Sequence, residues 1–179
     1  MHVMVKGVGE IRVSRRHVLS KKELKKLRKM IEEHYPEFPI ESMVPGKVEY
    51  AEVGGVEFYT VEGLPAFFVL GERLVPVLQY LLKKGYGWLP RVIVDRGATI
   101  AVGRGADLMI PGIRGLDDFD KGSIVVIVDE EADVPVGVGE ALVDSTFIRE
   151  KLESGSKKGK AIKNIHRPGD KIWRYASKL

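Results

Sequence analysis

The sequence predicts an α+β protein in which a small α/β domain is followed by a second domain built as a small β-barrel. Three observations lead to this fold class: a capped helix and a hairpin with a two-glycine turn in the first half, and several short strands in the second. A chain of 179 residues can hold two small domains. The segment 85–90 resembles a junction, so we expect domains at 1–88 and 89–179.

The first half should begin with a strand region and a helix. Residues 3–13 read as one or two short strands interrupted by glycines. Ser20 followed by Glu23 is a capping box, so a helix should start after Ser20 and end before Pro36. At about 100° per residue, one arc of this helix carries the side chains expected to be buried. They are Leu24, Leu27, Met30, Ile31 and His34.

The opposite arc of the same helix carries lysines. They are Lys21, Lys22, Lys25, Lys26 and Lys29. Like charges at i,i+4 repel, at a cost of about 0.2–0.5 kcal/mol per pair, and the pairs Arg28–Glu32 and Lys29–Glu33 should offset part of that cost. Two interpretations stay open: a solvated helix face, or a secondary basic surface that docks on RNA phosphates.

A hairpin, a buried strand and a second helix should follow. Residues 47–61 alternate around Gly54-Gly55, which supplies the two positive-φ positions of a tight turn. The apolar run 66–70 has the length of a buried strand. We expect the second helix to hold Pro76 in its first turn and to end at Gly85. Its buried stripe should consist of Leu74, Leu78, Leu81 and Leu82.

The second half should combine short strands with two short helices. Strands are expected at residues 91–94, 108–110, 124–128, 134–142, 162–166 and 171–175. One helix should span Gly97 to Gly103, and Ser145 should cap another around residues 147–152. Because the strands are short and closely spaced, we expect them to curve into a barrel and not an open sheet.

Composition excludes several classes of protein. The chain has no cysteine, which excludes disulfides, thiolate nucleophiles and cysteine zinc sites, and its four histidines show no metal-ligand spacing. No apolar run approaches the roughly 20 residues that span a bilayer, and no signal sequence is recognisable. A single Gln (Gln79) and a single Asn (Asn164) accompany many Lys, Arg and Glu, as in proteins of hot-living organisms. We expect a cytoplasmic thermophile protein with no metal, cofactor or membrane association.

The net charge of +4 is modest but unevenly distributed. Residues 12–29 hold nine basic residues and one acid, and residues 154–167 hold five basic residues and no acid. Residues 117–133 hold seven acids and one lysine. Such segregation is typical of a protein with one side for a polyanion and an acidic side that faces away from it.

No motif for catalysis or nucleotide binding is complete. Residues 155–161 resemble a P-loop, but three residues separate the glycines where four are needed, and Ala161 replaces the required Ser or Thr. Asp95 and Asp107 have no second carboxylate or histidine at an informative spacing. Asp107 is better explained as a turn residue that bonds its own backbone. We therefore expect a protein without enzymatic activity.

The basic segment 154–167 has the chemistry of an RNA contact. It offers charge, an amide and a flat ring in a glycine-containing loop and strand, which suits a bent RNA backbone and an exposed base. Its candidate residues are Lys157, Lys158, Lys160, Lys163, Asn164, His166 and Arg167. Gly97-Ala98 and Gly105-Ala106 are small enough to expose backbone N–H groups to phosphate or sugar.

Three ordered pieces of the second half resemble a PUA domain, the RNA-binding module named after pseudouridine synthases and archaeosine transglycosylases. They are residues 92–98, 105–113 and 158–173. Residues 67–69 and 76–90 are similar to the malignant T-cell-amplified-sequence (MCT) family of translation proteins, here of archaeal type. The resemblance covers nearly the whole chain and implies a pre-PUA α/β domain followed directly by the PUA domain.

The family resemblance implies binding to the small ribosomal subunit, in initiation or in clearing tRNA and mRNA after termination. Eukaryotic members work with density-regulated protein or an equivalent SUI1-type domain; this sequence has no such portion, so a separate SUI1-type factor is expected. In the family the RNA groove lies between the first helix and the last strands of the PUA module. Carried over, one wall is Arg96, Gly97, Ala98, Arg104, Gly105 and Ala106, and the other is Lys160, Lys163, Asn164 and His166.

Two functions besides a ribosomal RNA-binding adaptor stay open. PUA modules are common in RNA-modifying systems, so the chain could be an accessory RNA-targeting subunit of a tRNA- or rRNA-modification enzyme. The lysine-bearing helix could instead dock on an acidic protein, which would make the chain a protein-interaction module.

Overall fold

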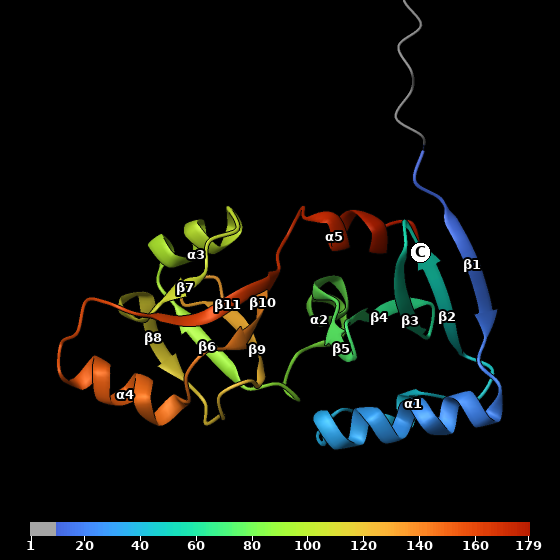
Figure 1. Ribbon diagram of the computed structural model, residues 1–179, viewed down its shortest axis with the longest axis horizontal. Coiled ribbons are helices and arrows are strands. Elements are labelled where there is room, and N and C mark those ends of the chain that lie inside the picture. Colours follow the sequence, from blue (N-terminus) through green and yellow to red (C-terminus); the bar gives the residue numbers. More distant parts are fainter. Residues whose placement is uncertain (1–9) are drawn as a thin grey trace, which may run out of the picture.

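The computed structural model describes residues 10–179, which form two sheets side by side with helices on both sides of them (Figure 1). The strands expected at residues 3–13 lie outside the described residues, apart from residues 10–13. The predicted α+β class is confirmed by this arrangement. Among residues 10–179, none of the helices has both the length and the apolar character that crossing a bilayer requires.

The first sheet is antiparallel, with its five strands in chain order. The strands are β1 (Val13–Val18), β2 (Val48–Val53), β3 (Val56–Val61), β4 (Leu64–Leu70) and β5 (Arg73–Pro76). The predicted hairpin is confirmed, because Gly54 and Gly55 turn between β2 and β3 with φ of 56° and 82°. The sequence did not predict β1 as a strand beyond Val13, since all six of its residues are exposed and show no apolar alternation.

Helix α1 (Lys21–His34) covers one face of this sheet. Ser20 and Glu23 form the predicted capping box, with the Glu23 N–H donating to Ser20 Oγ at 3.1 Å. Three of the residues expected on the buried arc are buried, namely Leu24, Leu27 and Ile31. His34 was expected on this arc but is exposed, because Tyr35 and Phe38 fill the core beyond the last turn. A 3-10 turn, η1 (Ile40–Ser42), leads from there to β2.

Helix α2 (Leu78–Lys84) starts later than the sequence pattern predicted. Pro76 ends strand β5 and does not open a helix, and Leu74 belongs to the same strand. Leu82 was expected to be buried but is 45% exposed, whereas Leu78 and Leu81 of the same helix are buried. The expected stop at Gly85 is confirmed by its φ of 94°.

The second sheet has six strands in the order β7-β11-β10-β9-β6-β8 and curves into a half-barrel with β7 and β8 at its edges. Its strands are β6 (Arg91–Val94), β7 (Leu108–Met109), β8 (Ile113–Leu116), β9 (Ile124–Asp129), β10 (Pro135–Ala141) and β11 (Lys160–His166). All pairs are antiparallel except β6 with β9. A 3-10 turn, η2 (Ile110–Gly112), joins β7 to β8, a strand that the sequence did not predict.

Three helices complete the second half: α3 (Arg96–Gly103), α4 (Ser145–Glu153) and α5 (Lys171–Ala176). Helix α3 matches the prediction. Helix α4 is capped by Asp144, and the Ser145 hydroxyl instead contacts the backbone of Phe119, so the prediction of Ser145 as the cap is wrong. Residues 171–175 were predicted as a strand but form α5, because Asp170 accepts from the Trp173 N–H and caps a helix.

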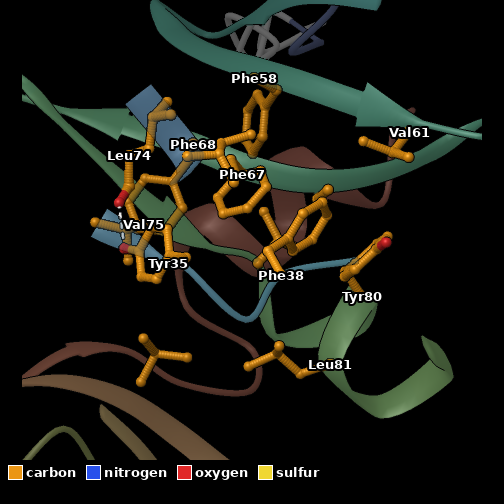
Figure 2. Packing of buried hydrophobic residues seen from close by; sticks show 14 of the residues in the cluster. Tyr35, Phe38, Phe58, Val61, Phe67, Phe68, Leu74, Val75, Tyr80 and Leu81 are labelled. Carbon is orange, nitrogen blue, oxygen red and sulfur yellow. Dashed lines mark hydrogen bonds between the residues drawn. The ribbon is translucent and has the colours of Figure 1, made fainter. Parts of the chain in front are cut away.

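The core of the first half extends into the second half, which also has a core of its own that includes Val92, Val125 and Ile148. Buried residues Ile124 and Val126 of β9 cluster with the core of the first sheet, whose aromatic centre is shown in Figure 2. Helix α5 also returns to the first half: a Cβ on Gly54 would lie 2.6 Å from the Tyr175 ring. The domain limits at 1–88 and 89–179 stay a prediction, and α5 packs against the first of these halves.

The first sheet separates two surfaces of the molecule. Neighbouring residues of a strand point to opposite faces, and Phe67 and Phe68 of β4 do so here. Phe67 contacts Tyr35 at the end of α1, with ring centroids 5.7 Å apart. Phe68 contacts His166 at the end of β11, at 5.6 Å. Helix α1 and the end of β11 therefore lie on opposite faces of this sheet.

Candidate nucleic-acid interface

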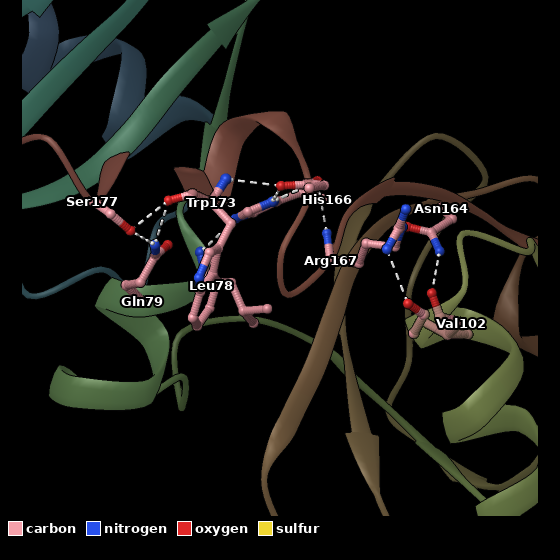
Figure 3. Close-up of polar contacts among 10 residues, drawn as sticks. Leu78, Gln79, Val102, Asn164, His166, Arg167, Trp173 and Ser177 are labelled. Carbon is pink, nitrogen blue, oxygen red and sulfur yellow. Dashed lines mark hydrogen bonds and ion pairs between the residues drawn. The ribbon is translucent and has the colours of Figure 1, made fainter. Parts of the chain in front are cut away.

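The C-terminal end of α3 and the strand β11 are fastened together by Asn164. Its side-chain amide donates to the carbonyl oxygens of Val102 and Ala106, at 2.9 and 3.0 Å (Figure 3). These carbonyls lie at the end of α3 and in the loop that follows it, where backbone groups lack helical partners. One amide therefore holds the segment 102–106 against β11.

Arg167 makes a second connection to the same loop. Its guanidinium donates to the Gly103 carbonyl oxygen at 2.9 Å. Gly105 has φ of 96°, and a Cβ there would lie 3.1 Å from Arg167 Nε. Glycine is therefore required at this position for two reasons, its left-handed backbone and the close approach of the guanidinium.

The structure brings the predicted groove residues of the loop and of β11 together. Arg104, Gly105 and Ala106 are exposed, as are Lys160 and Lys163 on the neighbouring strand. Lys160 is paired with Asp107 at 3.4 Å, whereas Lys163 has no ion pair within residues 10–179. We call this set, with Asn164 and Arg167 as its braces, the α3–β11 groove, after the groove that the family resemblance implies. Lys157 and Lys158 are exposed in the loop that enters β11.

The N-terminal end of α3 has different surroundings. Ala98 packs against Gly112, where a Cβ would lie 2.6 Å from that of Ala98, and Thr99 donates to Asp129 at 2.6 Å. Hydrogen bonds from Thr99 and from the backbone hold the pKa of Asp129 below its usual value. The predicted residues Arg96, Gly97 and Ala98 thus lie at the end of α3 that contacts the acidic end of β9, and not at the end braced to β11.

His166 does not face the groove. Its side chain is fully buried, so the prediction that its ring contacts an exposed base is wrong. The Leu78 N–H donates to His166 Nε2 at 3.0 Å, which leaves Nδ1 as the protonated nitrogen that donates to Asp170 at 3.0 Å (Figure 3). His166 thereby joins the end of β11 to the start of α2.

Asp170 completes this connection. Burial raises the pKa of its carboxyl group, but hydrogen bonds from His166, Trp173 and Arg167 outweigh burial and leave the pKa below its usual value. The carboxylate accepts from the N–H groups of Arg167 and Trp173 at 3.0 and 2.8 Å. One side chain therefore orients His166, caps α5 and fixes the backbone of Arg167.

Three of the seven acids of the stretch 117–133 make ion pairs, namely Asp117, Asp118 and Glu130. Asp117 accepts from Arg91 at 3.0 Å, and Asp118 accepts from Arg149 at 2.5 Å. Arg114 lies between Asp95 and Glu130, at 3.5 and 4.0 Å. Within residues 10–179, no group of His, Asp or Glu side chains has the arrangement of a metal site.

The lysines of α1 form a separate basic surface. Lys21, Lys22, Lys25, Lys26 and Lys29 are all exposed. None of them makes an ion pair within residues 10–179, and the expected pairs Arg28–Glu32 and Lys29–Glu33 are not formed. Arg28 instead turns inward and donates to the Met43 carbonyl oxygen. We call these five residues the α1 lysine face.

Sequence reasoning missed the bracing of the groove. The position of Gly105 before a predicted strand did signal a special backbone, but nothing local shows that a side chain from Arg167 covers it. Asp107 was interpreted as a turn residue, and it instead accepts from the Asn164 N–H at 2.9 Å across the sheet. These contacts join residues 53–64 positions apart, so no local pattern records them.

Comparison with known proteins agrees with this architecture. Residues 90–167 match the model of the PUA domain, and residues 15–84 match a domain of unknown function, DUF1947. The chain is 36% identical to the uncharacterized protein MJ1432 of Methanocaldococcus jannaschii, over 91% of this chain and 98% of that protein. It is 30% identical to translation machinery-associated protein 20 of Saccharomyces cerevisiae, over 84% and 86% of the two chains.

A solved structure shows the same fold along nearly the whole chain. The PUA domain protein APE0525 of Aeropyrum pernix K1, crystallised as a tartrate complex, superposes with a TM-score of 0.81 at 34% identity. The match covers 93% of this chain and 92% of that one.

A half-barrel with a basic strand braced to a short helix, preceded by a five-stranded sheet, defines an RNA-binding PUA domain behind a pre-PUA domain. The chain belongs to the MCT family, the family of translation machinery-associated protein 20, as the sequence resemblance implied.

Proposed function

We propose that this chain is an RNA-binding adaptor of the small ribosomal subunit that acts in translation initiation or in recycling after termination. It acts by binding and not by catalysis, in the cytoplasm, and a separate SUI1-type factor supplies any further initiation activity. Its similarity to a translation machinery-associated protein over most of both chains supports the choice of partner.

The observation that carries the RNA contact is the α3–β11 groove. Exposed Lys160 and Lys163 supply charge next to the exposed loop residues Gly105 and Ala106. The backbone N–H groups of these two residues donate to the Val102 and Ala101 carbonyl oxygens, so the prediction that they are free for a phosphate is wrong. Lysine ammonium groups neutralise phosphates, and backbone groups held in a fixed loop fit a bent strand by shape. Arg104 adds a third cation to this groove, and Lys157 and Lys158 extend it along the loop before β11. Asn164 and Arg167 act as braces, whereas Arg96, Gly97 and Ala98 contact RNA only if it continues past α3.

Sedimentation with small ribosomal subunits tests this proposal. We expect the chain to co-sediment at moderate salt, and the variant Lys160→Glu/Lys163→Glu to stay in the supernatant. The slope of log affinity against log salt should become shallower by about 0.7–0.9 for each lost phosphate contact. The matched control is Lys47→Glu/Lys83→Glu, which changes the charge equally at two exposed lysines away from the groove.

Failure of the folded wild-type chain to co-sediment would remove the ribosomal part of the proposal. An unchanged salt slope in the groove variant would remove Lys160 and Lys163 as contacts. Crosslinking that recovered tRNA together with a modification enzyme would instead favour the accessory role in RNA modification.

A further inference from the structure

The charges of the α1 lysine face are unfavourable for the stability of helix α1. Lys21 and Lys22 occupy the first turn, where the positive end of the helix dipole disfavours cations. Lys21, Lys25 and Lys29 repel one another at i,i+4, and the expected acidic neighbours do not pair with them. Of the sixteen lysines of residues 10–179, Lys84 and Lys160 make ion pairs, and the five lysines of this face make none. A bound polyanion would relieve the repulsion.

The shape and chemistry of the face favour RNA over protein. The lysines lie opposite Leu24, Leu27 and Ile31, so they project straight away from the sheet along a helix of about 21 Å. No aromatic or large apolar side chain of α1 accompanies them on this exposed side, although protein interfaces rely on such anchors and are depleted of lysine. Aromatic side chains are also what unpaired bases stack on. A row of lysines without them fits the phosphates of an RNA duplex.

The lysine face and the α3–β11 groove point in opposite directions. Phe67 faces the α1 side of the first sheet and Phe68 faces the β11 side, as their contacts with Tyr35 and His166 show. Figure 1 shows α1 along the lower edge of the molecule and α3 along the upper edge. The lysines face away from the sheet, so a short RNA bound at one surface does not reach the other.

We propose that the α1 lysine face is a second RNA-binding surface that takes the phosphate backbone of a duplex, so that one molecule bridges two RNA segments. The bridging rests on the proposed function of the α3–β11 groove, whereas duplex binding by the lysine face does not. The shared core and the buried His166 contact hold the two surfaces in a fixed orientation. The protein therefore sets the relative position of the segments that it joins.

A two-RNA capture experiment tests the bridge. A biotinylated stem-loop from small-subunit RNA, with a wide single-stranded loop and a stem too short to span the α1 lysine face, is fixed to beads. The full chain is added, and retention of a short fluorescent RNA duplex is measured. Anisotropy of the fluorescent duplex alone measures direct binding to the lysine face. The face variant is Lys21→Glu/Lys25→Glu/Lys29→Glu, and the groove variant is Lys160→Glu/Lys163→Glu. The matched control is Lys47→Glu/Lys83→Glu/Lys178→Glu, at three other exposed lysines.

The face variant should keep its binding to the stem-loop and lose duplex retention by about tenfold or more, with a salt slope of duplex binding reduced by about 2–3. The groove variant should lose the stem-loop and still bind the duplex in solution. The control should behave as the wild type does. Because the substituted side chains are exposed, far-ultraviolet circular dichroism should be unchanged in all three.

Duplex binding by the face variant at the level of the control would overturn the inference. A face variant that loses binding to polyglutamate but keeps the duplex would also overturn it, and would assign the face to an acidic protein. If the groove variant keeps the stem-loop while the face variant loses the duplex, the lysine face stands and the proposed function of the groove fails. If both variants lose duplex retention on the beads but only the face variant loses direct duplex binding, the lysine face and the proposed function of the groove are both supported.

Discussion

The two ends of β11 differ in what their side chains do. The first end, Lys160 to Lys163, presents exposed lysines to solvent, and Asp107 makes the one ion pair there within residues 10–179. From Asn164 onward the side chains are turned to other elements: Asn164 to α3, and His166 to α2. One strand can therefore carry RNA-binding side chains at one end and side chains that position other elements at the other end. Substitutions at the first end should change RNA affinity, and those at the second should change stability.

The largest effect is expected for His166→Ala. The substitution removes a fully buried ring, leaves the Leu78 N–H without its partner and takes one of three donors from the Asp170 carboxylate. We expect a loss of about 3 kcal/mol in the free energy of unfolding, from a cavity and unsatisfied polar groups together. Urea denaturation measures it. The same substitution at exposed His34 should cost less than about 0.5 kcal/mol, and an equal cost at both sites would contradict the buried role.

Asn164→Ala should affect both properties. Loss of the amide leaves the Val102 and Ala106 carbonyls without this donor, at a cost of about 2 kcal/mol. The loop 102–106 then loses its position, and we expect RNA affinity to fall about tenfold, equivalent to 1.4 kcal/mol. Thermal unfolding and RNA titration measure the two effects. Thr146→Ala, at an exposed position of α4, is the control, and normal RNA affinity in the Asn164 variant would show that the brace is dispensable.

Asp170 should make stability depend on acid pH. Because its pKa is lowered in the folded state, its contribution is complete above the usual carboxyl pKa of about 3.9 and is lost as the pH falls through the lowered value. Asp170→Asn keeps an oxygen that can cap α5 but loses the charge, so we expect a loss of about 1 kcal/mol at neutral pH. Denaturation at neutral and acid pH measures it. The variant should lose less stability on acidification than the wild type, and parallel pH curves would refute the assignment.

The smallest effect is expected for Asp107→Asn. This change removes a negative charge beside Lys160, while one side-chain oxygen remains to accept from the Asn164 N–H. RNA affinity should rise a few-fold, and the salt slope should steepen by up to about 0.9 as Lys160 becomes available to a phosphate. Titrations at several salt concentrations measure both. Asp120→Asn changes the net charge equally in the acidic stretch, and an equal gain there would indicate a general charge effect.

Local rules were sufficient where the signal lies within one element. The capping box at Ser20 and the glycine turn at Gly54-Gly55 were predicted because their hydrogen-bonding and φ requirements are met by adjacent residues. Strand β9 was predicted because a strand that is buried on both faces appears in the sequence as a continuous apolar run. These elements, with the PUA resemblance, account for the fold class.

Two of the failures share a different cause. His166 carries the same polar ring whether it is exposed or buried, and only its contact with Leu78, 88 residues earlier, decides which. Residues 171–175 were interpreted as the last of the short strands, but the Asp170 cap and the sheet of the first half select a helix. Leu82 fits the apolar stripe by its spacing and lies within α2, but it is 45% exposed. Contacts between the two halves decided the outcome at His166 and at residues 171–175, and periodicity does not record such contacts.

The return of α5 to the first sheet has a consequence for synthesis of the chain. Phe58 and Phe68 lie on the sheet face that α5 and His166 cover, yet they are translated long before residues 166–176. While the nascent polypeptide is still tethered, that aromatic face has nothing to cover it from the C-terminal side. Folding of the first half therefore cannot be completed until the C-terminal residues have been synthesised. A chaperone at the exit tunnel would meet this hydrophobic face first.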